Sequence, residues 1–320
     1  MKVLTVTFNP ALDRQIVLDN FQVNKLHRVS SLNDMELSPG GKGINVSLAL
    51  ENFGVPSVAM GFLGGYMGRI LLDELRKRSK MISTNFVFIR GETRENIEII
   101  DPVNKTITEI NSPGPEIEEE DINHLMRRFI MTLSRVEVVV ISGSIPMNAP
   151  DDLYPMFVKE ALSKGKVIFV ETTDKNLTTL YKSGVMPTVV KPDLRAGNYL
   201  LGKELENLED FVEAGKKLLG CGAKLVVLSY HVDSDIIMTE DGVWMISPTV
   251  EIDYSHLLGT GDTYMAAMVY DYINGEKDLV EIGKFGYIAA LAKTKKLRKE
   301  LPTLQEVREY NDKYAIKKVG

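Results

Sequence analysis

The chain has 320 residues, of which 44% are hydrophobic, so it is long enough to bury the core of one large α/β domain or two smaller ones. Its 38 basic and 44 acidic residues give a net charge of -6 and are spread along the chain, so neither nucleic acid nor an anionic membrane is expected as a partner. A small anionic substrate would need a local cluster of positive groups.

The compartment is indicated by the cysteine count and the amino terminus. The single cysteine, Cys221, rules out an internal disulfide framework and is expected to be a small packing residue in a reducing compartment. The opening MKVLTVTFNP predicts a first strand and not a signal peptide. No apolar stretch approaches the ~18 residues that span a bilayer. We therefore expect a soluble, cytoplasmic protein.

Short apolar runs rich in β-branched residues recur between helical patterns. They lie at residues 3–8, 57–63, 136–142, 166–170, 188–191 and 224–229. Continuous apolar runs are typical of strands buried on both faces, and the helices between them supply parallel crossovers. The sequence therefore predicts a doubly wound, mainly parallel α/β sheet flanked by helices, in a single domain spanning residues 1–320. Ligands are expected at the carboxyl ends of the strands.

Two segments interrupt this rhythm, at residues 13–23 and 86–111, and residues 101–105 separate two alternating runs as a hairpin would. They predict a small added sheet, built from about residues 12–36 and 86–112. Such a sheet could form a lid over a site on the main domain; a decorative hairpin is the alternative. The acidic run at 116–121 predicts a solvated helix start, where the helix dipole favours acids.

The stretch LSPGGKGINV, at residues 37–46, places three glycines around Lys42. Glycines let the backbone approach a ligand closely, so phosphates or hydroxyls often lie against such loops. A nucleotide-binding P-loop needs Ser or Thr directly after the lysine, and here Gly43 follows it. The loop is therefore a different ligand site or a surface turn before a helix.

Another glycine-rich stretch lies late in the chain. It consists of Gly259, Thr260, Gly261 and Asp262, which precede an uninterrupted helical pattern. Glycines at the mouth of a helix leave backbone N–H groups and a positive dipole end pointing at one spot, which is an anion site. A carboxylate beside that anion suits phosphoryl transfer, in which a base orients a hydroxyl. The alternative for Asp262 is a first-turn or N-cap acid.

Six motifs occur in order over almost the whole chain: TVTFNPALD, PGGKGIN, GETREN, SGSIP, KPD and GTGD. In this order they resemble the ribokinase-like sugar kinases, and within them the phosphofructokinase B branch. The resemblance implies that Asp262 is the catalytic base and that Gly259, Thr260 and Gly261 form the anion hole, with Thr260 in place of the usual alanine.

The same resemblance assigns the glycine-rich loop to the sugar site. It implies that Asp13 holds substrate hydroxyls, that Gly40 and Gly41 let the sugar approach the backbone, and that Asn45 donates to a further hydroxyl. Carboxylates and amides on short stems make the oriented hydrogen bonds that a polyol requires. A turn aspartate and a helix-start polar residue remain the alternatives for Asp13 and Asn45.

The phosphohexose branch sends an arginine from its lid onto the phosphate already present on the sugar. By resemblance this is Arg94, with Asn96 nearby, Lys42 as a further cation and Ser144 lining the site. Arginine supplies a planar fork that suits phosphate, whereas lysine adds a point charge. A solvated lid arginine and a plain strand-end turn are the alternatives for Arg94 and Ser144.

The nucleotide half departs from the family pattern, although Lys191, Asp193 and Ser229, together with Gly259 and Gly261, are expected to bind the cofactor. Ala196 stands where relatives carry the glutamate of KPNxxE. His231 and Ser234 replace two glycines after Ser229. VETTDKNL, at residues 170–177, likewise stands where the family has an aspartate and a glycine.

These observations predict a kinase that uses magnesium ATP to convert fructose 1-phosphate to fructose 1,6-bisphosphate. Tagatose 6-phosphate or fructose 6-phosphate as the substrate, an unphosphorylated sugar or nucleoside, and a weakly catalytic sugar-phosphate-binding regulator stay open. The four histidines are scattered, so no zinc site is expected. No side chain is assigned to a metal, and the ligands of magnesium are expected to come largely from phosphates and water. The exposed face of the small sheet predicts a homodimer through the lid.

Overall fold

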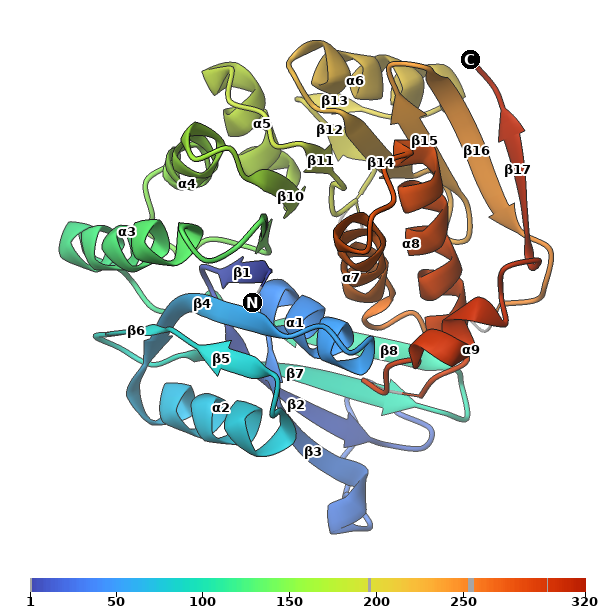
Figure 1. Cartoon of the computed structure of the whole chain (residues 1–320). Coiled ribbons are helices and arrows are strands. Elements are labelled where there is room, and N and C mark those ends of the chain that lie inside the picture. The colour runs from blue at the N-terminus through green and yellow to red at the C-terminus, as the bar shows by residue number, and fades with distance from the viewer. Residues whose placement is uncertain (1, 195–196, 253–255, 298) are drawn as a thin grey trace.

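The protein is described here from a computed structural model that covers residues 2–194, 197–252, 256–297 and 299–320. Its main element is a twisted 11-stranded sheet with ten strands along one path and β6 (Val87–Ile89) paired to β4 (Figure 1). In spatial order the ten are β17 (Tyr314–Lys318), β16 (Gly242–Pro248), β15 (Asp235–Thr239), β14 (Leu225–Ser229), β11 (Val189–Val190), β10 (Val167–Glu171), β9 (Val138–Ser142), β1 (Val3–Thr7), β4 (Ser57–Gly64) and β5 (Ile82–Thr84).

The strands from β14 through β5 pair in parallel, whereas β15, β16 and β17 extend the sheet antiparallel at one edge. All six strands that the sequence predicts are present, and each lies in the parallel part. Their residues are almost all buried, as expected for strands covered on both faces. The predicted fold class is therefore confirmed.

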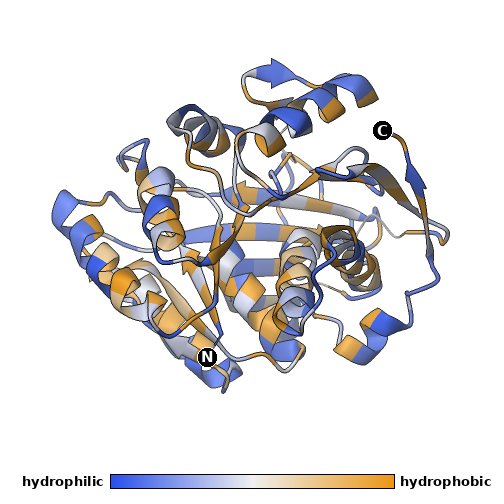
Figure 2. Cartoon of the chain, turned by 45° about the horizontal axis from the view of Figure 1, so that its top comes forward, coloured by the Kyte–Doolittle hydropathy of each residue, from blue (hydrophilic) through white to orange (hydrophobic). Residues whose placement is uncertain are grey.

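Helices cover both faces of the large sheet (Figure 1). They are α1 (Lys42–Asn52), α2 (Gly65–Arg78), α3 (Glu119–Leu133), α4 (Leu153–Ser163), α5 (Asp174–Ser183), α6 (Leu208–Gly220), α7 (Thr260–Ile273), α8 (Leu279–Lys293) and α9 (Leu304–Arg308). One core cluster joins the sheet to α3, α4, α5 and α6, and a second joins its other face to α1, α7 and α8. Apolar residues accordingly concentrate on the central strands and on the helix faces turned toward them (Figure 2).

A separate four-stranded sheet, called the small sheet below, has the order β3 (Met35–Gly40), β2 (Ala11–Val17), β7 (Arg94–Asp101) and β8 (Thr106–Asn111). Strands from the two segments predicted to form an added sheet therefore pair with each other, and β7 and β8 form the predicted hairpin. The start of the second segment differs from the prediction, because β6 pairs with β4 and belongs to the large sheet. The short 3-10 helix η1 (Leu32–Asp34) precedes β3, and β12 (Tyr199–Leu200) and β13 (Lys203–Glu204) make a separate hairpin.

Local chemistry explains where two of the other predicted features lie. The acidic run starts α3 with a capping box, in which the side chains of Glu118 and Asp121 accept from each other's backbone N–H groups. Cys221 follows α6 as its half-buried C-cap residue and packs against the core. Among the residues described, no helix combines the length and apolar character needed to cross a membrane.

Candidate active site

A cavity of about 910 Å³ opens at the carboxyl ends of β1, β9, β10, β11 and β14, between the large sheet and the small sheet. This is where parallel α/β sheets bind ligands. Of the residues that the sequence assigned to the site, all except Gly40 line the cavity: Asp13, Gly41, Lys42, Asn45, Arg94, Asn96, Ser144, Lys191, Asp193, Ser229, Gly259, Thr260, Gly261 and Asp262.

Asp262 lies in the first turn of α7 and is 6% exposed. The helix starts after Gly259, whose φ of 78° is in the left-handed region that favours glycine. The Thr260 N–H donates to the Leu257 carbonyl at 3.2 Å, closing a turn before the helix. The N–H groups of Gly261 and Asp262 belong to the first turn, whose donors have no partner within the helix, so they can face an anion.

The Asp262 carboxylate is held in place from α1. Asn45 Nδ2 donates to Asp262 Oδ2 at 2.8 Å, although the two residues are 217 positions apart in sequence. Asn45 was predicted to bind a sugar hydroxyl, and this contact adds a further task, because an amide bonded to one carboxylate oxygen fixes the direction of the other.

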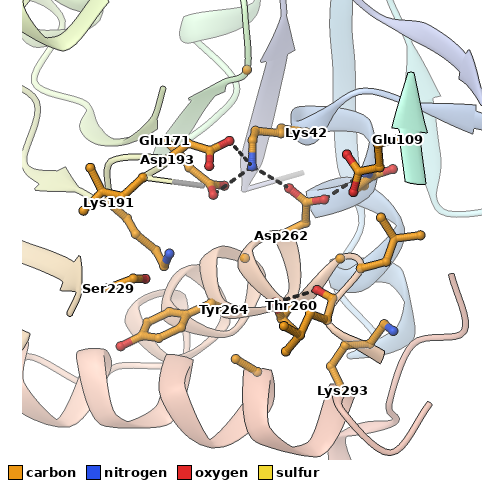
Figure 3. A pocket seen from close by; sticks show the side chains of 18 of the residues that line it. Lys42, Glu109, Glu171, Lys191, Asp193, Ser229, Thr260, Asp262, Tyr264 and Lys293 are labelled. Atoms are coloured by element: carbon orange, nitrogen blue, oxygen red, sulfur yellow. Dashed lines mark hydrogen bonds and ion pairs between the residues drawn. The ribbon is translucent and has the colours of Figure 1, made fainter. Parts of the chain in front are cut away.

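Lys42, the first residue of α1, lies among three carboxylates (Figure 3). Its Nζ is 3.0 Å from Glu171 Oε1, 3.3 Å from Asp193 Oδ2 and 3.9 Å from Asp262 Oδ1. The carboxylates come from the end of β10, from the turn after β11 and from α7. Lys42 therefore joins the predicted base to the wall on which the nucleotide phosphates are expected.

The small sheet supplies the predicted sugar contacts. Asp13 on β2 and Asn96 on β7 are register partners, and Asn96 Nδ2 donates to Asp13 Oδ1 at 2.8 Å. Gly40 at the end of β3 lies directly behind this carboxylate, and an added Cβ there would collide with it. The bare backbone at Gly40 thus makes room for the Asp13 carboxylate. The sequence instead assigned Gly40 to the approach of the sugar, but Gly40 does not line the cavity.

Arg94, at the start of β7, is anchored by two backbone carbonyls. Its Nε donates to the Asn9 carbonyl at 3.2 Å and its Nη1 to the Ser112 carbonyl at 3.0 Å. Burial lowers the pKa of Arg94, and the Asp13 charge opposes that effect. Ser144 lies close by, with its Oγ 3.4 Å from Asn9 Nδ2. The guanidinium is therefore held in a fixed position on the cavity wall.

On the wall where the sequence predicts the nucleotide, Lys191 and Ser229 lie at the ends of β11 and β14 beside the ring of Tyr264 (Figure 3). The Lys191 Nζ is 5.3 Å from the centre of that ring. Burial raises the pKa of the neighbouring Asp235, and the Lys191 charge and a hydrogen bond with Ser229 oppose the shift. Lys191 therefore lies in the cavity wall beside a buried carboxylate.

The loop after Ser229, where the sequence replaces two glycines, is closed on itself. The backbone N–H groups of Tyr230 and His231 donate to the Ser234 carbonyl, and the Tyr287 hydroxyl donates to the Asp233 carbonyl at 2.6 Å. The loop lines the cavity and presents side chains to it. Another of the departures from the family pattern, Ala196, lies outside the described residues.

The sequence missed several charged residues of the cavity, among them Glu171, Lys293 and Lys299. Glu171 fell in the stretch noted as a departure from the family pattern, so a signal existed. Lys293 is the last residue of α8 and lies close to Gly259. It is fully buried, and its Nζ donates to the Lys296 carbonyl at 3.3 Å. Lysines are almost never fully buried without partners, but sequence alone does not mark a buried one.

Burial lowers the pKa of Lys293 to about 8, with the charges of Glu300 and Asp262 opposing the shift. The unfolded chain therefore binds more protons than the folded one between about pH 8 and the ordinary lysine pKa, so stability should rise with pH in that window. The test is the free energy of unfolding of the parent minus that of Lys293→Met. We expect this difference to become larger from pH 8 to pH 10, by up to about 1.4 kcal/mol for each unit of the pKa shift. Urea unfolding at both pH values measures this; a constant difference would contradict it.

Comparison with known proteins connects this cavity to a family. Residues 7–303 match the pfkB family of carbohydrate kinases. A 1-phosphofructokinase of Borreliella burgdorferi is 31% identical over 307 residues, which are 96% of this chain and 95% of that protein. A crystal structure from Thermotoga maritima, described as a possible 1-phosphofructokinase, is 50% identical with a TM-score of 0.96 over 100% of both chains. Phosphofructokinase-2 of Escherichia coli, 22% identical, shares the fold with a TM-score of 0.86 over 97% of both chains.

The chain has the architecture of a ribokinase-like carbohydrate kinase. Its elements are a doubly wound sheet, a small second sheet beside the carboxyl ends of the strands, and the GTGD motif at the N-terminus of α7. The chain belongs to the pfkB family, and it is a sugar-phosphate kinase.

Proposed function

We propose that the enzyme transfers the γ-phosphoryl group of ATP to a hydroxyl of fructose 1-phosphate, giving fructose 1,6-bisphosphate and ADP. The observation that carries this proposal is the buried carboxylate of Asp262 at a helix mouth, in one cavity with Asp13, Asn96 and Arg94. The names of the Borreliella and Thermotoga relatives favour the 1-phosphate. We infer that residues 1–320 work as a single kinase domain with the small sheet as its lid.

In the transfer, Asp262 accepts the proton of the sugar hydroxyl while the hydroxyl oxygen forms a bond to the γ-phosphorus. The bond from that phosphorus to the β–γ bridging oxygen breaks, and ADP leaves with the electron pair. Asn45 keeps the Asp262 carboxylate oriented through its hydrogen bond. The N–H groups of Gly261 and Asp262 donate to the phosphoryl oxygens as charge builds on them.

Mg²⁺ fits the residues around Lys42. Glu171 Oε2 is buried and, within the part of the chain described, has no hydrogen-bond partner, and Asp193 lies on the same wall. Mg²⁺ prefers oxygen ligands and usually keeps phosphate and water ligands as well. We propose that Glu171 and Asp193 hold it, directly or through water; when bound, it neutralises charge on the phosphates. ATP would then extend from the GTGD helix mouth toward Lys191 and Ser229.

Arg94 is proposed to read the phosphate already present on the sugar, because its carbonyl anchors fix the guanidinium before the substrate arrives. We expect Arg94→Ala to raise the KM for the phosphosugar about tenfold or more, and that for ATP within about threefold, since a hydrogen bond to a charged group contributes roughly 1.5–3 kcal/mol. Steady-state kinetics with each substrate varied measures this. Equal effects on both KM values would contradict the role.

A coupled ADP-release assay with and without Mg²⁺ tests the proposed function across fructose 1-phosphate, fructose 6-phosphate, tagatose 6-phosphate, fructose and ribose. The highest kcat/KM for fructose 1-phosphate is expected. A preference for another phosphohexose would change the substrate but keep the chemistry, and a preference for fructose or ribose would contradict the phosphate-reading role. Calorimetric binding of a phosphohexose without any ADP release would instead indicate a regulator.

We further propose that two lids pair in a homodimer. On the face of the small sheet opposite Asp13 and Asn96, the register places Ile16 beside Ile99, and Ile97 beside Ile110. Ile110 is 53% exposed. An apolar sheet face of this kind favours a partner surface. One structure of the Escherichia coli relative is described as a tetrameric inhibited form. Analytical ultracentrifugation tests the pairing; a monomer at micromolar concentration would contradict it.

A further inference from the structure

Lys299 brings a positive charge to the sugar end of the cavity from outside the small sheet. It lies in the segment between α8 and α9, 286 positions from Asp13 in sequence, and its side chain is 19% exposed. Its Nζ donates to Asp13 Oδ2 and is 4.0 Å from Glu98 Oε1. Both carboxylates are nearly buried, at 5% and 7% side-chain exposure.

The two carboxylates sit on adjacent strands of the small sheet. Asp13 pairs in register with Asn96, and Gln15 pairs with Glu98. Asn96 Nδ2 donates to Asp13 Oδ1 at 2.8 Å, and Gln15 Nε2 donates to Glu98 Oε2 at 2.6 Å. The amides satisfy one oxygen of each carboxylate but carry no charge. Two buried carboxylates facing one cavity therefore depend on a cation.

Lys299 is suited to that task. Burial opposes its charge, yet the Asp13 and Glu98 carboxylates together raise the pKa of Lys299 above its ordinary value. Burial raises the pKa of Glu98, and the Lys299 charge counters that shift. An ammonium in contact with one carboxylate and near a second lowers the cost of burying both.

We propose that Lys299 is a positioning residue, through which the segment after α8 orients Asp13 for the sugar hydroxyls and holds the lid over the cavity. A carboxylate offers about four lone-pair sites. Asn96 and Lys299 occupy two of them, so Asp13 can still accept from a sugar hydroxyl while it is fixed from both sides. The sugar then meets an acceptor that is already oriented.

The same contact links the small sheet to the segment between α8 and α9, which is far from it in sequence. Asp13 and Glu98 belong to the small sheet, whereas Lys299 belongs to the segment that leaves α8 on the large sheet. Breaking the contact removes the cation that serves both acids and leaves only the charge of Arg94 to act on Asp13. The lid should then open more often, because an unpaired buried charge is relieved by contact with water.

The variants that test this proposal are Lys299→Met, which keeps the length of the side chain without its charge, Lys299→Gln, which keeps a donor, and Lys299→Arg, which keeps the charge. The matched control is Lys295→Met, in the same segment, whose exposed Nζ donates only to the Glu251 carbonyl among the bonds described. Circular dichroism checks that each variant is folded.

The kinetic readout rests on the proposed function. For Lys299→Met and Lys299→Gln we expect the KM of the phosphohexose to rise about tenfold to a hundredfold, as for the loss of a charged hydrogen-bond partner, with kcat and the KM of ATP within about threefold. Lys299→Arg should recover most of the loss, and Lys295→Met should match the parent. A fall in kcat with an unchanged phosphohexose KM, or no rescue by arginine, would overturn the positioning role.

Hydrogen exchange of the ligand-free protein tests the lid contact without any substrate. Amides of β2 and β7 should exchange several-fold faster in Lys299→Met than in Lys295→Met, while those of β9 and β10 should not change. Unchanged exchange in β2 and β7 would overturn the lid contact even if the enzyme is the proposed kinase. If no phosphohexose is phosphorylated by the parent, the proposed function fails while the exchange result still decides this inference.

Discussion

Asp262→Asn is expected to lower turnover by about a hundredfold or more, the usual range for loss of a general base, while phosphohexose binding stays within about threefold of the parent. Asparagine keeps the size and the hydrogen bond from Asn45 but cannot take up the proton of the sugar hydroxyl. The N–H groups at the helix mouth remain, so binding of the anion should survive. Initial rates of ADP release, together with calorimetry of the phosphohexose, measure the two quantities.

Asp271→Asn is the matched control, because Asp271 lies on the same helix and does not line the cavity. Its turnover should equal that of the parent. Turnover of Asp262→Asn within a few-fold of the parent would show that Asp262 is only a first-turn acid of α7. A loss of phosphohexose binding as large as the loss of turnover would likewise contradict the role of a base.

Six strands of the parallel part of the large sheet could be predicted from sequence, but the short strands β5 and β6 and the antiparallel edge could not. The predicted strands are continuous apolar runs because helices bury both of their faces. In contrast, β16 is only partly buried, and β17 is an exposed edge strand that ends in two lysines. β15 is buried and as long as β10 and β14, but it begins at an aspartate and directly follows the loop at 230–234. Within the described residues 225–248, no helix separates β14, β15 and β16, so the alternation of strands and helices that indicates the parallel strands does not indicate these.

The candidate site likewise has residues that sequence could predict and contacts that it could not. Motif residues lie at element ends, where glycine spacing and strand ends indicate them, and the cavity gathers nearly all of them. The pairing of Lys299 with Asp13 has no local signal, because the two residues meet only through the fold. Sequence also could not give the direction of a side chain. The motif indicates that Lys42 belongs to the site, but only the structure shows the three carboxylates toward which its Nζ points.

Those surroundings lead to the second prediction of large effect. The Lys42 Nζ lies between Glu171, Asp193 and Asp262, at the point where the transferred phosphoryl group would pass. We infer that Lys42 neutralises charge on this group, in addition to or instead of reading the phosphate on the sugar. Without its ammonium, only the proposed Mg²⁺ would offset the charge of the three carboxylates, and like charges at such distances repel an incoming anion in a partly buried site.

Lys42→Met should therefore lower kcat about a hundredfold to a thousandfold, the range for losing one group that stabilises transition-state charge, and raise the KM of the phosphohexose much less. Lys42→Arg should retain more activity, and Lys295→Met serves again as the surface control. The discriminating measurement is kinetics with fructose 1-phosphate and with fructose. Lys42 would be a reader of the sugar phosphate if kcat were kept and only the KM of fructose 1-phosphate rose. A loss of kcat shared by both sugars instead places its charge on the transferred group, because both reactions pass through that group and only one substrate carries a second phosphate.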